Sequence, residues 1–185
     1  MKFAMIGLGK MGLNLVKNAV DNGHEVVAFD LNADFVKEAA DYSDKVSAAS
    51  DLDDMLAQLP SPKVVWVMVP AGVPTNSTID TLIEKMVEGD IIIDGGNSNY
   101  KDNLEQNKRT TAAGIKFFDA GTSGGMSGAR NGGNFMIGGD DAEAWKVIEP
   151  LFKSIALEDG YLYTGRLGSG HYLKMVHNGI EYGMM

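Results

Sequence analysis

Short apolar segments alternate with longer, partly polar segments along most of the chain. The continuous apolar runs at residues 64–69 and 91–94 are bounded by turn-forming residues, which is typical of parallel strands covered on both faces. Shorter apolar runs predict further strands at residues 3–6, 25–29, 116–120, 135–137 and 161–163.

The segments between these runs favour helices. Residues 11–22 place Met11, Leu15 and Ala19 at helical spacing, and Gly23 follows as a stop signal. The remaining helices are predicted at residues 33–40, 51–58, 75–87, 99–113, 142–152 and from 169 to the end.

Repeated strand–helix units imply parallel strands with helices on both faces. We therefore predict an α/β fold, a Rossmann-type doubly wound and mostly parallel sheet. The glycine-rich residues 121–139 are interpreted as loops that approach a ligand or pack tightly. We expect residues 1–168 to form a dinucleotide-binding domain. Residues 169–185 end without a stop signal, so we expect them to begin a helix that leads into a further, absent domain.

Composition narrows the function classes. The 185 residues suit one domain with a sizeable core, and a net charge of −9 disfavours nucleic acid as a partner. The absence of cysteine excludes disulfides and thiol nucleophiles, and three histidines without an HExxH pattern predict no metal site. Neither a signal peptide nor a run of about 20 apolar residues is found, so we expect a cytoplasmic protein without a membrane partner.

Residues 7–12 read GLGKMG, a GxGxxG pattern between a predicted strand and a predicted helix. In this context Gly7 permits a tight turn, Gly9 lets the backbone approach a pyrophosphate, and Gly12 lets helix and strand pack closely. The free N–H groups at the helix start favour the anion. The alternative, a glycine-rich turn without a ligand, does not explain why all three glycines fall in this context.

Asp30 ends the second predicted strand, eighteen residues after Gly12. A carboxylate there accepts hydrogen bonds from the adenosine ribose hydroxyls and repels a 2′-phosphate. Leu31 follows where an NADP site often places arginine. The sequence therefore predicts NAD as the preferred cofactor, unless Asp30 is an incidental strand-end residue.

The last predicted helix carries polar residues on one face. Lys174, His177, Asn178 and Glu181 are spaced i, i+3, i+4 and i+7, which places them on one side of a helix. Lys174 and Glu181 would lie about 10 Å apart along the axis, the length of a small substrate. A solvated face is the simpler interpretation, but histidine and asparagine are unusual there, and we favour a functional face.

Two further candidates follow predicted strands, where ligands bind in such sheets. Asn97 belongs to the DGGNS segment at 94–98, and Ser123, Gly124 and Gly125 belong to the GTSGG segment at 121–125. Small residues there leave room for a ligand and expose backbone N–H groups to a carboxylate or phosphate. Each segment taken singly is equally consistent with a tight loop.

Taken together, GLGKMG, DGGNS, GTSGG and KMVHNGIEYG (174–183) resemble the 6-phosphogluconate dehydrogenase family, one of the β-hydroxyacid dehydrogenases. The resemblance covers the whole chain. It implies oxidative decarboxylation of 6-phosphogluconate, a sugar-acid phosphate, to ribulose 5-phosphate in the pentose phosphate pathway, with reduction of NAD, by a homodimer. The cofactor site that it implies comprises Gly7, Leu8, Gly9, Lys10, Met11, Gly12, Asp30, Val69, Pro70 and Asn97.

The same resemblance implies roles for the last helix. Lys174 takes the proton from the C3 hydroxyl and, once protonated, polarises the ketone during loss of CO2. Glu181 then protonates C1 of the enediol. The substrate residues that the resemblance implies are Asn97, Ser123, Gly124, Gly125, His177 and Asn178, with Tyr182 at the phosphate.

The chain departs from the commonest family pattern at the cofactor site and near the substrate. Asp30 and Leu31 stand where NADP-using members carry Asn-Arg, so the chain resembles the NAD-preferring branch. Pro70 replaces a lysine, Met184 replaces an aspartate, and residues 126–127 replace two glutamates. Members continue into a large helical domain that supplies the dimer interface and part of the phosphate site. We therefore expect these residues alone to bind NAD but to turn over substrate poorly.

Two alternatives remain. One is an NAD-dependent 3-hydroxyacid dehydrogenase that does not decarboxylate, although such relatives more often carry asparagine at the position of His177 and lack the IEYG continuation. The other is an NAD-binding module without catalysis, against which the intact Lys174–Glu181 face argues.

Overall fold

The computed structural model describes residues 1–185 and contains one eight-stranded sheet, in the order β3-β2-β1-β4-β5-β6-β7-β8. Neighbouring strands are parallel except β6 and β7, which are antiparallel. The predicted doubly wound, mostly parallel fold is confirmed. The strands are β1 (Lys2–Ile6), β2 (Glu25–Phe29), β3 (Val46–Ala48), β4 (Val64–Val67), β5 (Ile91–Asp94), β6 (Lys116–Ser123), β7 (Gly133–Gly139) and β8 (Ala156–Tyr163).

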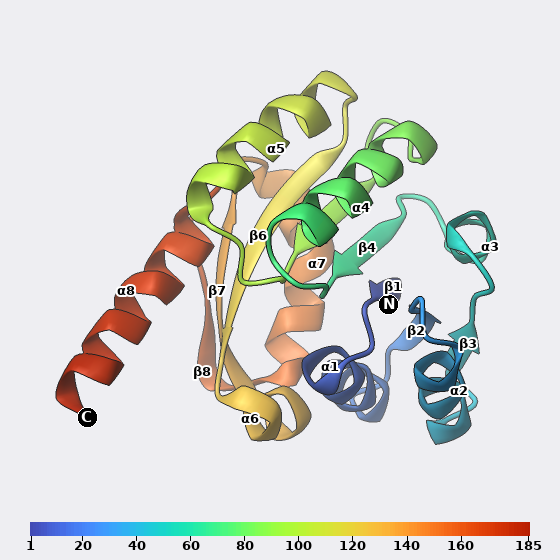
Figure 1. Cartoon of the computed structure of the whole chain (residues 1–185), viewed down its shortest axis with the longest axis horizontal. Helices are drawn as coiled ribbons and strands as arrows, with labels where there is room; N and C mark the ends of the chain where they lie inside the picture. The colour runs from blue at the N-terminus through green and yellow to red at the C-terminus, as the bar shows by residue number, and fades with distance from the viewer.

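Eight helices connect or follow these strands. Side chains of Asn32, Asp51, Asn99 and Asp141 accept backbone N–H groups at four helix starts, which explains where those helices begin. Helix α8 leads away from the sheet, with the C-terminus at its far end (Figure 1). The helices are α1 (Lys10–Asp21), α2 (Ala33–Tyr42), α3 (Leu52–Ala57), α4 (Val73–Lys85), α5 (Tyr100–Ala112), α6 (Gly125–Asn131), α7 (Ala142–Ile155) and α8 (Ser169–Met184).

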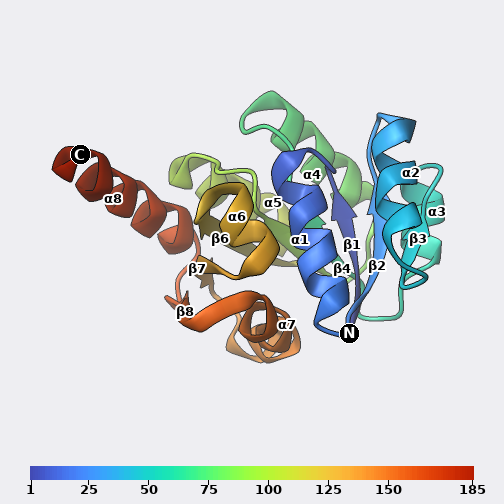
Figure 2. The same cartoon turned by 90° about the horizontal axis from the view of Figure 1, so that it is seen from below.

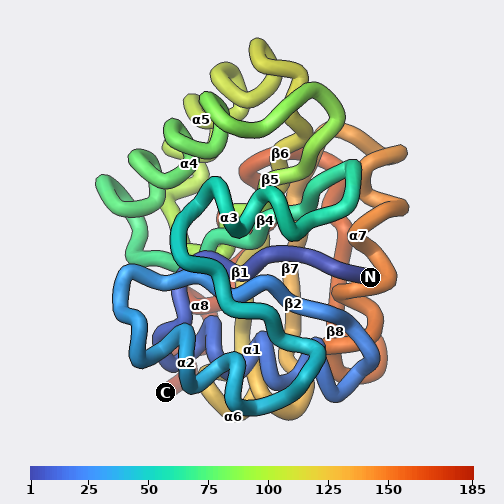
Figure 3. The backbone as a smooth tube through the Cα atoms, turned by 90° about the vertical axis from the view of Figure 1, so that its right-hand side faces the viewer, coloured from blue at the N-terminus to red at the C-terminus, as the bar shows by residue number.

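The sheet separates two apolar cores, and β4 shows why. Successive side chains of a strand point to opposite faces, so Val64 and Trp66 join the core under α1 and α7, whereas Val65 and Val67 join the core under α3 and α4. Burying one such side chain stabilises the fold by about 1.5–3 kcal/mol. Helices α1, α6 and α7 lie together (Figure 2), and α4 and α5 lie at the opposite end of the view from α1, α2 and α6 (Figure 3).

The interpretation of residues 121–139 as loops was wrong, although the strand predicted at residues 135–137 lies within β7. They are not loops, because β6 runs to Ser123, α6 follows, and β7 spans Gly133–Gly139. Glycine is required at two positions of β7, because side chains of β6 occupy the space that a Cβ would need. A Cβ at Gly138 would overlap Asp119, and a Cβ at Gly139 would overlap the Phe118 ring. Strand β3 was also missed, since three residues carry too little periodicity.

None of the helices combines the length and the apolar character that crossing a bilayer requires.

Candidate active site

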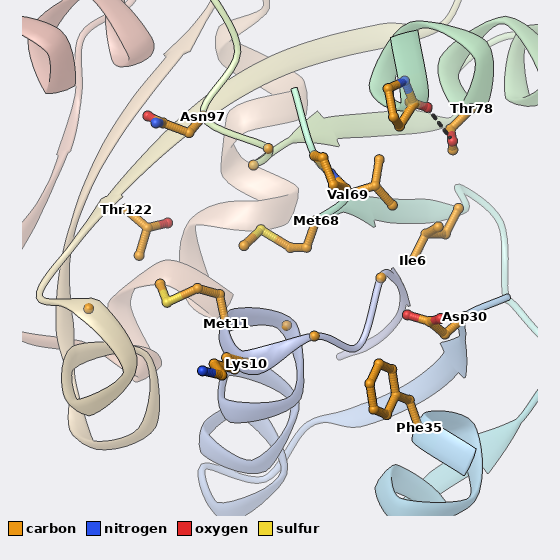
Figure 4. Close-up of a pocket in the computed structure, with 18 of the residues that line it drawn as sticks. Ile6, Lys10, Met11, Asp30, Phe35, Met68, Val69, Thr78, Asn97 and Thr122 are labelled. Carbon is orange, nitrogen blue, oxygen red and sulfur yellow. Dashed lines mark hydrogen bonds between the residues drawn. The ribbon is translucent and has the colours of Figure 1, made fainter. Parts of the chain in front are cut away.

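A cleft of about 1250 Å³ opens where the parallel strands end. The segments that follow β1, β2, β4, β5 and β6 line it, together with α4 and α8, because the carboxyl ends of parallel strands meet at one edge. Asp30 and Phe35 lie toward one end of the cleft and Asn97 and Thr122 toward the other, with the start of α1 between them (Figure 4). The cleft is therefore elongated, with different chemistry at its two ends.

The three glycines of residues 7–12 have the predicted geometry. Gly7 has φ +93°, a conformation that favours glycine, and a Cβ at Gly12 would overlap the carbonyl oxygen of Gly7. Gly9 lines the cleft with no protein atom within 4 Å of the position of a Cβ, so the backbone is open to a ligand. Gly9 also precedes α1, whose first N–H groups have no side-chain cap. This arrangement fits a pyrophosphate.

Asp30 is held at the end of β2 by two backbone groups. Its Oδ2 accepts a hydrogen bond from the Leu8 N–H at 2.7 Å, and its Oδ1 accepts one from the Asn32 N–H at 2.8 Å. The carboxylate therefore faces the cleft with a fixed orientation and with lone pairs left for ribose hydroxyls. The next residue, Leu31, is uncharged and 96% exposed, so this position supplies no cation for a 2′-phosphate.

The opposite end of the cleft is shaped by two turns whose backbone has positive φ. Asn97 has φ +59°, in the left-handed region that asparagine tolerates better than most residues, and it lines the cleft. Gly124 has φ +113° and lines the cleft together with Ser123 and Gly125. The fold thus brings the two predicted substrate segments together.

Helix α8 contributes Lys174, Asn178 and Glu181 to the same cleft, three of the four residues that the helical spacing places on one face, and also Tyr182. Burial lowers the pKa of Lys174, and the negative charge of Glu181 partly opposes this shift. A Cβ at Gly121 would lie 2.6 Å from the Cβ of Lys174, so only glycine lets this turn of α8 approach β6 so closely.

Two predicted site residues do not line the cleft. The side chain of Leu8 is buried in the core under α1, and only its backbone N–H reaches toward the cofactor end, where Asp30 accepts it. His177 lies on α8 with its Nδ1 3.6 Å from the Glu181 Oε2, an i,i+4 pair on the helix surface. Its predicted contact with substrate stays a prediction.

Sequence reasoning missed one wall of the cleft. Helix α4 contributes Pro74, Ser77, Thr78 and Thr81, whose spacing is i, i+3, i+4 and i+7. The test that singled out α8 could have found this face, but small uncharged side chains gave no reason to apply it. The other missed lining residues are Ile6, Phe29, Leu31, Phe35, Leu52, Met68, Gly95, Gly96 and Thr122.

The glycine turn before α1 and the carboxylate that ends β2 define a Rossmann-type domain that binds a nicotinamide dinucleotide. The profile of the NAD binding domain of 6-phosphogluconate dehydrogenase matches residues 2–165. The chain belongs to this family of oxidoreductases, as its four motifs predict.

Relatives of the chain are longer than the chain. It is 48% identical over 185 residues to a Bacillus subtilis protein with the provisional name 6-phosphogluconate dehydrogenase YqeC, covering 100% of this chain and 61% of that protein. It is 41% identical over 186 residues to the Haloferax volcanii protein named 6-phosphogluconate dehydrogenase, NAD(+)-dependent, decarboxylating, covering 100% of this chain and 60% of that protein.

A solved structure has the same fold. The 6-phosphogluconate dehydrogenase of Plasmodium falciparum, determined without ligand, with its cofactor NADP+ and with its substrate 6-phosphogluconate, superposes with a TM-score of 0.92 at 29% identity. The match covers 99% of this chain and 41% of that one. The chain thus corresponds to less than two thirds of each of these three proteins.

Proposed function

We propose that the protein oxidises and decarboxylates 6-phosphogluconate to ribulose 5-phosphate and reduces NAD. The observation that carries this proposal is the single cleft shared by the glycine turn, Asn97, Lys174 and Glu181. The turn and Asp30 would hold the dinucleotide, and the same cleft carries Asn97 and the two titratable groups of α8. The relatives named for this reaction support the substrate.

The residues of α8 suit the proton transfers of this reaction. A nicotinamide dinucleotide held by the glycine turn and Asp30 would supply the acceptor for the hydride from C3 of the substrate. Lys174, whose pKa burial lowers, takes the C3 hydroxyl proton as general base and then donates a hydrogen bond to the resulting ketone. As CO2 leaves, Lys174 returns its proton to the C3 oxygen, so an enediol forms. Glu181 in its acid form, two helical turns further along, then protonates C1 of the enediol while Lys174 takes the hydroxyl proton back. Two groups this far apart act on different carbons.

The remaining cleft residues hold the substrate in this proposal. The amides of Asn97 and Asn178 and the hydroxyl of Ser123 bind sugar hydroxyls and the carboxylate. Gly124 and Gly125 expose backbone N–H groups in the same place, and Tyr182 binds the phosphate. Because relatives extend well beyond the length of this chain, we propose that residues outside it complete the phosphate site and a homodimer interface, and that residues 169–185 lead into that region.

The experiment that tests the function measures NADH formation from 6-phosphogluconate by the natural protein, with released CO2 trapped. We expect NADH and CO2 in equal amounts, and faster reduction of NAD than of NADP. NADH formation without release of CO2 would show that the protein is a hydroxyacid dehydrogenase that does not decarboxylate its substrate. Binding of NADH without any reduction of NAD by the substrate would show that the protein is an NAD-binding module without catalysis.

Cofactor preference is expected to reverse when two residues at the end of β2 are changed. The double variant Asp30→Asn, Leu31→Arg removes the charge that repels a 2′-phosphate and adds a cation that binds it. Leu31 is exposed, so its replacement leaves the fold intact. The ratio of kcat/KM for NADP to that for NAD should rise by about 10- to 150-fold, since a charge-assisted bond contributes roughly 1.5–3 kcal/mol. Leu31→Gln is the matched control, and an unchanged ratio in the double variant would contradict the role of Asp30.

A further inference from the structure

A set of buried polar side chains connects α8 to the turn that carries Asn97. The set consists of Asp94 on β5, Asn103 on α5, Asp119 on β6 and His171 on α8, and we call it the buried bridge. All four side chains are at least 96% buried, and none of them lines the cleft. Buried polar groups are costly unless they are paired, and hydrogen bonds pair the members of this set.

Asp119 fixes the start of α8. Its Oδ1 accepts a hydrogen bond from the Gly168 N–H at 2.6 Å, and its Oδ2 accepts one from the His171 N–H at 2.7 Å. Helix α8 has no side-chain cap of its own and no acidic residue in its first turn. A carboxylate from the neighbouring strand therefore satisfies the first N–H groups of the helix.

His171 carries the connection from α8 to α5. Its Nδ1 lies 2.6 Å from the Oδ1 of Asn103, and the Nδ2 of Asn103 donates to Asp94 Oδ2 at 2.7 Å. Since the amide oxygen of Asn103 can only accept, Nδ1 of His171 carries the hydrogen and donates it. The Nε2 of His171 has no partner in the protein, so its ring is bonded through Asn103 alone.

Asp94 completes the connection at the substrate end of the cleft. Its Oδ1 accepts a hydrogen bond from the Gly96 N–H at 2.9 Å, next to Asn97 with its positive φ. His171 lies one helical turn before Lys174 on α8. The buried bridge thus joins the residue before Asn97 to the helical turn before Lys174, through side chains on four elements of the fold.

We propose that Asn103 and His171 are positioning residues, which hold the turn of Asn97 and the helix of Lys174 at the separation that the reaction needs. This inference rests on the proposed function for its kinetic consequence. Neither residue lines the cleft. A displacement of about 1 Å between reacting groups costs on the order of 100-fold in rate, so positioning of this kind has a measurable effect.

The test compares three variants of the natural protein. His171→Leu removes the donor, and we expect kcat with 6-phosphogluconate to fall by about 10- to 100-fold while the Kd for NADH stays unchanged. His171→Asn places an amide N–H at the position of Nδ1 and should recover most of that loss. His24→Leu is the matched control, because His24 is also buried, at 6% exposure, and bonds Ser154 at 2.7 Å away from the cleft. It should lower stability but leave kcat unchanged.

Hydrogen exchange of the Gly96 N–H gives a readout that needs no turnover. We expect faster exchange in His171→Leu and the native rate in His171→Asn and His24→Leu, because only the first variant breaks the bridge. Native exchange at Gly96 in His171→Leu, or an equal loss of kcat in His171→Leu and His171→Asn, would overturn the proposal. If the natural protein does not turn over 6-phosphogluconate, the proposed function fails, and the exchange at Gly96 alone decides the positioning role.

Discussion

Replacing Lys174 by methionine is expected to lower kcat with 6-phosphogluconate by about 1000-fold or more, since a general base contributes roughly 100- to 10,000-fold. Methionine keeps much of the side-chain volume but has no amine to take the C3 proton. The cleft residues at the dinucleotide end, Gly9 and Asp30 among them, are untouched, so the Kd for NADH should not change. Stopped-flow or steady-state NADH formation measures kcat, and quenching or enhancement of NADH fluorescence measures binding.

Lys153→Met provides the control for this comparison. Lys153 lies exposed on α7, away from the cleft, and its replacement removes the same amine from the surface. Wild-type kcat in this variant together with loss in Lys174→Met would support the assigned base. Retention of more than a tenth of the wild-type kcat in Lys174→Met would show that another group takes the proton.

Gly12→Ala is expected to destabilise the fold by about 3 kcal/mol or more, at the upper end of the range for overpacked sites. The added Cβ would overlap the carbonyl oxygen of Gly7, which is backbone in a tight turn and cannot rotate away. The start of α1 must then move from β1, and NADH binding should fall with it. Thermal or urea unfolding of the protein without cofactor measures the first effect.

Gly9→Ala separates stability from binding in the same turn. No protein atom lies within 4 Å of the added Cβ, and Gly9 has φ −64°, which alanine adopts without strain. Stability without cofactor should match that of the wild type, whereas the Kd for NADH should rise by about 10-fold or more, because the methyl group enters the space of the pyrophosphate. Unchanged affinity in Gly9→Ala would contradict the assigned cofactor site, and unchanged stability in Gly12→Ala would contradict the packing role.

Local patterns were sufficient for much of the cleft. Gly7, Gly9 and Gly12 lie within one turn, and their spacing predicts its geometry. The position of Asp30 follows from the end of one predicted strand. The face of α8 that carries Lys174 and Glu181 follows from helical periodicity alone. The four sequence motifs together were also sufficient to identify the family, and the profile match confirms that family.

Other features depend on contacts between distant segments. The glycines of β7 look like loop residues until β6 is placed beside them, where Phe118 and Asp119 occupy the space of the missing side chains. The wall formed by α4 consists of a proline and small hydroxyl residues. These residues line the cleft only because the fold places α4 at the same cleft as the cofactor turn and α8. The buried bridge joins residues 94, 103, 119 and 171, and no spacing along the chain relates them.

The sequence by itself thus determined the class of fold, the cofactor turn and the helical face with the two titratable groups. The first follows from the repeated alternation of strands and helices, and the other two are each encoded in a short segment. The tertiary structure alone decided which of these segments share a cleft, that Leu8 and His177 do not line it, and how burial lowers the pKa of Lys174. The physical reason is that periodicity orients a side chain relative to its own helix or strand, whereas distance, burial and electrostatic environment depend on the elements packed against it.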